Sequence, residues 1–226
     1  MSIVIIGGFL LISISVGGMI AWIFSTLFHY TTHGLSLVCG GFLIGLLILD
    51  IIPSAFQLYE LFALLLGCVI GYCLFHLLHS LHHIQNTSVS LLTIAMILHT
   101  IPLSLTIGNL LGNAALTMPI IISLILHHIP EGFALSTALL SQGEKYWRLF
   151  CYFIIFSMFF SFFVWAGQYW SFTLKVQGIL MGLSIGLIAI TSLTELIMQP
   201  FRKTTAITAL SSILFGFLMS YLFHLL

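Results

Sequence analysis

Charged side chains are almost absent from this chain, and this scarcity limits what it can fold into. Only five of the 226 residues are Lys or Arg and five are Asp or Glu, whereas 61% are hydrophobic. A soluble globular domain carries about 25% charged residues, so this chain cannot build an ordinary water-facing surface. The sequence therefore predicts an integral membrane protein in contact with a lipid bilayer. Its net charge of zero gives no reason to expect a nucleic-acid partner.

Short polar stretches divide the apolar sequence into segments that are long enough to cross a bilayer, which takes about 20 mostly apolar residues. We predict an all-α polytopic membrane protein with eight transmembrane helices in one domain, 1–226. The N-terminal segment lacks a basic leader region, so we interpret it as the first span rather than a cleaved signal. The predicted helices are 3–28, 34–57, 61–79, 89–111, 116–140, 149–166, 174–198 and 206–225.

The few basic residues predict how the helices are oriented. Lys145 and Arg148 lie between the fifth and sixth predicted helices, and Arg202 and Lys203 lie between the seventh and eighth. With eight spans these two loops share one side, and only Lys175 lies on the other. Basic residues in short loops favour the cytoplasm. We therefore expect both termini to be extracellular.

One motif, Ile-Leu-His-x-Ile-Pro, occurs twice, at 97–102 and 125–130. It lies in the fourth and fifth predicted helices, which a very short turn joins into a hairpin. His99 and His127 lie about 20 Å and about 17 Å of helix from that turn. Both histidines are therefore expected at the same depth, near the middle of the bilayer. Polar groups at that depth normally face the interior of the bundle.

The second copy of the motif carries further groups that could bind a metal ion. His127 and Glu131 are spaced i,i+4 and His128 and Glu131 i,i+3, so these pairs share a helix face. The proline of each motif disturbs the preceding turn, and broken helices at the midplane are typical of transporter binding sites. Imidazole and carboxylate ligands suit Zn²⁺, and also Fe²⁺ or Mn²⁺. We predict a site formed by His99, His127 and Glu131, with His128 as either a further ligand or a packing residue.

These residues resemble the ZIP (Zrt-, Irt-like) family of divalent-metal transporters, in particular its bacterial members. The sequence His-His-Ile-Pro-Glu-Gly at 127–132 is similar to the family's motif on its fifth helix. The fourth helix keeps His99 and Pro102, but Leu103 stands where the family has glutamate. The resemblance implies an eight-helix transporter in the plasma membrane, with both termini outside, that moves metal toward the cytoplasm and is not an enzyme. A homodimer is compatible with it.

The same resemblance extends to two further acidic residues. Asp50 precedes Pro53 as in the family's second helix, and Glu195 ends a Gly-rich segment like that of its seventh helix. The predicted topology puts Asp50 near the outer mouth and Glu195 near the inner end, where each would assist metal movement. Many family members hold two metals bridged by two glutamates. Because Leu103 stands in place of one of these glutamates, the resemblance implies a single, more weakly held metal.

Two other features of the sequence are relevant to binding and packing. Histidines 76, 79, 82 and 83 cluster before and within the third loop, where either a weak metal site or a solvated helix end is expected. Small residues recur at a spacing of four in several helices, which permits close helix contact. These positions are Gly41/Gly45, Gly67/Gly71 and Gly178/Gly182/Gly186.

Three alternatives to a transporter stay open at this stage. A membrane di-iron enzyme would use the box His79-Ser-Leu-His82-His83, but the chain has no second box of this kind. A haem protein could use His99 and His127 as axial ligands, which would leave Glu131 without a role. A non-transporting metal sensor could be built on the same helices.

Overall fold

The structure is a computed structural model that describes residues 3–28, 32–81, 87–110, 114–170 and 172–225. Some side chains within these helices lie outside the description, among them those of 114–127. The side chain of His127 is therefore outside the described part of the chain. Histidines 79, 82 and 83 also lie outside the described side chains.

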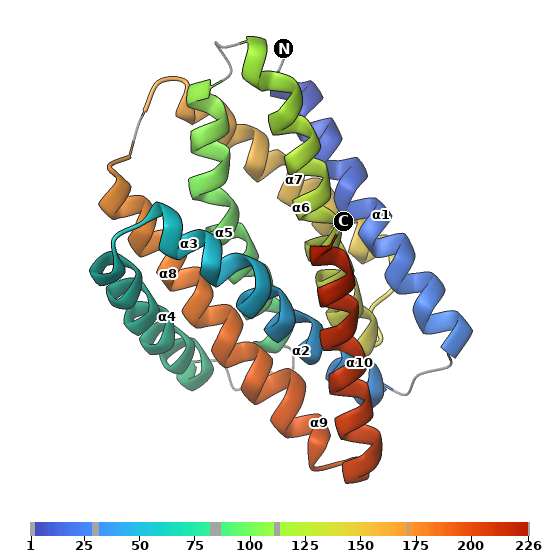
Figure 1. Cartoon of the computed structure of the whole chain (residues 1–226). Coiled ribbons are helices and arrows are strands. Elements are labelled where there is room, and N and C mark those ends of the chain that lie inside the picture. Colours follow the sequence, from blue (N-terminus) through green and yellow to red (C-terminus); the bar gives the residue numbers. More distant parts are fainter. Residues whose placement is uncertain (1–2, 29–31, 82–86, 111–113, 171, 226) are drawn as a thin grey trace.

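Eight helical rods make up the described part of the chain, and no strand occurs in it (Figure 1). This confirms the predicted all-α class and the eight helices. Two rods are composite, because a π-helical segment interrupts each of them. The elements are α1 (Ile3–Phe28), α2 (Thr32–Leu46) with η1 (Leu47–Ile51) and α3 (Ile52–Leu58), α4 (Leu61–Leu81), α5 (Thr87–Leu110), α6 (Ala114–Ser141), α7 (Tyr146–Gly167), α8 (Leu174–Thr191) with η2 (Ser192–Met198) and α9 (Gln199–Phe201), and α10 (Ala206–His224).

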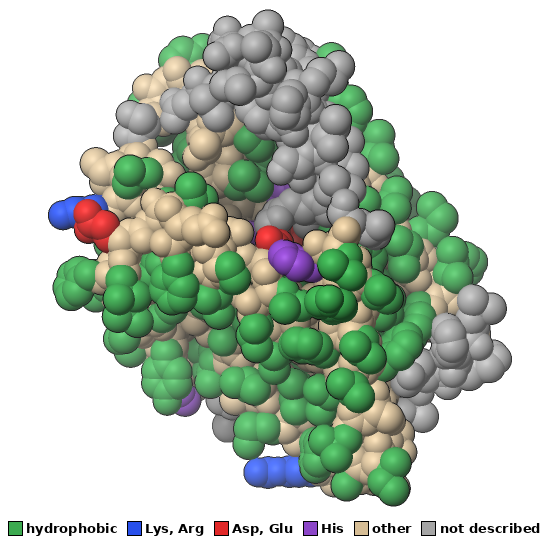
Figure 2. Space-filling view, in the orientation of Figure 1, with side chains coloured by type: hydrophobic (Ala, Val, Ile, Leu, Met, Phe, Trp, Pro, Cys, Tyr) green, Lys and Arg blue, Asp and Glu red, His purple; other side chains and the backbone are tan. Residues whose placement is uncertain are grey.

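Several of these rods have the length and composition of membrane-spanning helices. Among the described residues, five stretches qualify, and two shorter helices, Leu61–Leu77 and Thr93–Gly108, are also apolar. Figure 2 shows one face of the molecule, on which hydrophobic side chains predominate and charged ones occupy a few isolated places. These features are those of a membrane protein. The five stretches are Ile3–Thr26, His33–Leu58, Trp147–Gly167, Leu174–Phe201 and Ala206–His224.

The helix contacts form two corresponding sets. In one set α1 packs on α6, and α2 packs on α10 and α6. In the other set α7 packs on α5, and α8 packs on α4 and α5. The first three rods thus correspond in order to the last three, and α5 corresponds to α6. Because successive rods alternate in direction, the two halves run in opposite senses.

A pair of glycines marks the crossing point in each of the four main helix pairs. A Cβ atom added to Gly17 of α1 would overlap the carbonyl oxygen of Ile129, and one added to Gly132 of α6 would overlap that of Ile14. The backbones therefore touch directly at these crossings, which only glycine permits. The other mutual pairs are Gly108 with Gly167, Gly41 with Gly216, and Gly67 with Gly182.

Each π-helical segment carries an acidic residue and is followed by proline. Asp50 lies in η1 just before Pro53, and Glu195 lies in η2 before Pro200. The wider turn is visible in the backbone, because the Ile52 N–H donates to the carbonyl of Leu47, five residues back. Proline has no N–H to donate, and its ring collides with the carbonyl four residues earlier. A wider turn before the proline relieves that collision.

Candidate metal site

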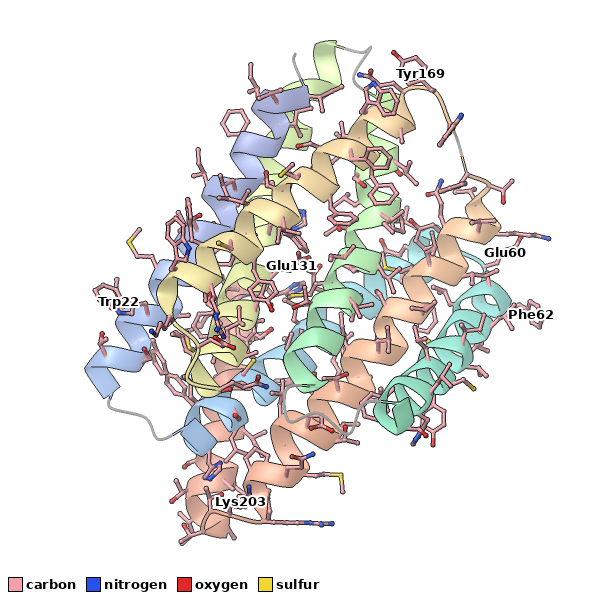
Figure 3. All side chains as sticks on the ribbon, turned by 180° about the vertical axis from the view of Figure 1, so that it is seen from behind. Trp22, Glu60, Phe62, Glu131, Tyr169 and Lys203 are labelled. Atoms are coloured by element: carbon pink, nitrogen blue, oxygen red, sulfur yellow. The ribbon has the colours of Figure 1, made fainter. Side chains whose placement is uncertain are left out.

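Glu131 lies inside the bundle, whereas Glu60 and Tyr169 lie toward one end of the helices and Lys203 toward the other (Figure 3). Only 3% of Glu131 is exposed. The cause is local, because the next residue, Gly132, brings α6 into backbone contact with α1. A carboxylate this deep among apolar helices is costly unless charged or polar groups stabilise it.

His128 supports one oxygen of this carboxylate. Its Nδ1 lies 2.6 Å from the Oε2 of Glu131, one helical turn away on α6, and the histidine is completely buried. The rings of Phe156 and Phe160 on α7 flank the imidazole edge-on, with centroids 6.4 Å and 5.6 Å away. This aromatic packing holds the imidazole in place, so that it can orient Glu131 by a short hydrogen bond.

His99 of α5 faces the other oxygen. Its Nε2 lies 3.4 Å from the Oε1 of Glu131, and only 3% of His99 is exposed. This separation exceeds the usual range of a nitrogen–oxygen hydrogen bond. Two ligands on one tetrahedral zinc, with bonds of about 2.0–2.2 Å, lie about 3.4 Å apart. The separation of the Nε2 of His99 and the Oε1 of Glu131 therefore matches that of two ligands on one zinc ion.

A third helix reaches this group through a methionine. The Sδ of Met181 on α8 lies 3.2 Å from the Nδ1 of His99, and only 8% of Met181 is exposed. The imidazole of His99 thus has Glu131 on one side and Met181 on the other. No sequence pattern indicated Met181, because a thioether in an apolar Gly-rich helix is indistinguishable from an ordinary core residue.

Hydroxyl groups close in sequence to His99 and Met181 are bonded to their own helix. The hydroxyl of Thr100 donates to the carbonyl of Ile97, and that of Ser104 donates to the carbonyl of Ile101. On α8, the hydroxyl of Ser184 donates to the carbonyl of Met181. All three are buried. Such local bonds let polar residues stay in an apolar interior without a partner on another helix.

The structure thus brings together three of the predicted site residues, His99, His128 and Glu131. Asp50 and Glu195 lie on η1 and η2, where both are half-buried, and Glu195 accepts a hydrogen bond of 2.8 Å from Gln199. Within the described side chains, no group of three or more His, Cys, Asp or Glu residues is arranged to hold a metal ion. His99 and Glu131 face each other from α5 and α6, and His128 is directed at Glu131.

Fold and site together define an all-α bundle of apolar helices with a buried histidine–glutamate group. No protein-family model matches the sequence, and no curated protein matches it. The resemblance to the ZIP family therefore stays a prediction that rests on the motifs themselves.

Proposed function

We propose that this chain is a ZIP-like transporter of divalent metal cations, with Zn²⁺ as the first candidate and Fe²⁺ or Mn²⁺ as further substrates. In this proposal it spans the plasma membrane with both termini outside and moves metal toward the cytoplasm. His99 and Glu131 are ligands of a single metal, and His127 is a further ligand. Asp50 and Glu195 act at the outer and inner ends of the path.

The observation that carries the proposal is the separation of 3.4 Å between the Nε2 of His99 and the Oε1 of Glu131. A buried carboxylate kept only for packing would be replaced by an apolar residue at little cost, often with a gain in stability. Ionisable groups inside a membrane bundle usually serve a substrate or ion path. The facing nitrogen and oxygen provide the ligand types and the spacing that zinc requires.

The decisive experiment is uptake of radioactive zinc into proteoliposomes. We expect saturable uptake by the wild-type protein and its loss in Glu131→Gln, because an amide cannot supply an anionic ligand. Glu60→Gln is the matched control, since the Glu60 side chain is 64% exposed and lies outside the site. Absence of uptake by folded wild-type protein that still binds zinc in calorimetry would contradict transport and indicate a metal sensor.

A further inference from the structure

We propose that Met181 is a positioning residue, which fixes the tautomer of His99 so that its Nε2 is the ligating nitrogen. That the Nε2 of His99 binds a metal ion rests on the proposed function, whereas the assignment of the tautomer does not. The inference comes from the contact of 3.2 Å between the Nδ1 of His99 and the Sδ of Met181.

The chemistry of a thioether determines the direction of this hydrogen bond. Thioether sulfur has no proton to donate and is only a weak acceptor. In a hydrogen bond between these two atoms the Nδ1 of His99 is therefore the donor. A neutral imidazole carries a single N–H, so a ring whose Nδ1 donates to the sulfur keeps its lone pair on Nε2. That lone pair is on the nitrogen that faces the Oε1 of Glu131.

This arrangement is the one that a metal-binding histidine needs. Such histidines nearly always donate the other ring N–H to an acceptor that fixes the tautomer and orientation of the ring. The usual acceptor is a carboxylate, a backbone carbonyl or water. Here it is an uncharged sulfur, which orients the ring without placing a second negative charge beside Glu131. Met181 and His99 are both buried, so bulk water cannot readily replace the sulfur.

The tautomer can be measured directly in the metal-free protein. The experiment is solid-state NMR of protein with ¹⁵N-labelled histidine in lipid bilayers, with the His99 signals assigned by comparison with His99→Gln. We expect the wild type to carry the proton on Nδ1. Met181→Leu keeps the size of the side chain but removes the acceptor, so a population with the proton on Nε2 should appear. Met181→Gln, whose amide oxygen can accept, should restore the wild-type signal.

Met96→Leu is the matched control, because Met96 is another buried methionine, three residues before His99 on α5. Its substitution should leave the His99 signals unchanged. Two results would overturn the proposal: a wild-type His99 with its proton only on Nε2, or a Met181→Leu variant with an unaltered tautomer.

Zinc binding measured by calorimetry gives an independent readout. Loss of the outer partner of a metal-binding histidine typically weakens affinity 10–100-fold. We expect a loss of about tenfold or more in Met181→Leu and near-complete recovery in Met181→Gln. Equal affinity of Met181→Leu and wild type would contradict a positioning role. If the wild type binds no zinc, the proposed function fails, whereas the NMR result still decides the role of Met181.

Discussion

At the scale of single residues, the two carboxylate oxygens of Glu131 face two different histidines. His128 holds one carboxylate oxygen by a short bond, and His99 faces the other across a wider gap. The first contact orients the carboxylate, and the second has the spacing of two ligands on one zinc ion.

The role of His128 can be tested by His128→Phe, which fits the aromatic surroundings but cannot donate to Glu131. We expect the protein to remain folded and its zinc affinity to fall about 10–100-fold, the usual effect of removing an outer hydrogen bond at a metal site. His128→Gln, whose amide can donate, should recover part of the loss. Calorimetry on the three proteins checks this, and equal affinity in His128→Phe and wild type would reduce His128 to packing.

Part of this site was predictable from the sequence. The repeated motif indicated that His99 and Glu131 belong to one site, and the structure places the Nε2 of His99 3.4 Å from the Oε1 of Glu131. The motif left the role of His128 open, because His127 and His128 are both spaced to share a helix face with Glu131. The packing of His128 against Phe156 and Phe160 of α7 could not be read from the sequence. Met181 could not be predicted, since it is 82 residues from His99 and shares no pattern with it.

At the scale of helices, direct backbone contact at glycine pairs fixes how α6 sits on α1. Gly17→Ala should force the two helices apart, because the new methyl group would meet the backbone of Ile129 rather than a flexible side chain. We expect a loss of stability of about 1–3 kcal/mol, typical of overpacking. Because α6 carries Glu131, zinc affinity should fall as well.

The matched control for this change is Gly8→Ala on the same helix, where an added Cβ has nothing within 4 Å. Thermal unfolding in detergent should show a lower midpoint for Gly17→Ala only. A similar midpoint in both variants would mean that α1 and α6 adjust to the methyl group without cost.

The helices themselves were largely predictable, because the length and apolarity of a span decide its existence. The glycine spacings also indicated real contacts, since Gly41, Gly67 and Gly182 all meet a backbone carbonyl of the neighbouring helix. The prediction of helices 34–57 and 174–198 did not include the wider turns that precede Pro53 and Pro200. Helix partners could not be predicted, since they depend on which faces meet across the whole chain.

At the scale of the whole molecule, an ion pair relates the ends of the helices. The Nζ of Lys175 lies 3.9 Å from the Oε2 of Glu60, so the loops before α4 and α8 lie at the same end of the bundle. This agrees with the predicted alternation of loops. The excess of basic residues in the loops at the opposite end predicts that the opposite end faces the cytoplasm.

The orientation can be tested with single cysteines in a variant whose four native cysteines are changed to serine. We expect Lys175→Cys to react with a membrane-impermeant thiol reagent in intact cells. Lys203→Cys, at the other end, should react only after permeabilisation, because basic loops favour the cytoplasm. The reverse labelling pattern would contradict the prediction that both termini are outside.

The correspondence of α5 with α6 predicts where a second carboxylate would act. Leu103 occupies in the first motif the place that Glu131 occupies in the second. We expect Leu103→Glu to raise the zinc content from one ion per chain toward two, because two carboxylates can bridge a pair of metals. Leu103→Gln, which adds polarity without charge, should stay at one. Metal analysis of the purified proteins checks this, and one ion in the glutamate variant would contradict it.

The two corresponding sets of helix contacts also have a consequence for the energies of alternative conformations. If each half adopted the conformation of the other, the same pairs of corresponding helices would stay in contact. The end of the bundle that opens would then change from one side of the membrane to the other. Inverted halves of this type are what alternating access uses. The two conformations would then differ in free energy through the positions at which corresponding residues differ in type, such as Glu131 and Leu103. Substitutions at these positions would shift the populations of the two conformations as well as binding.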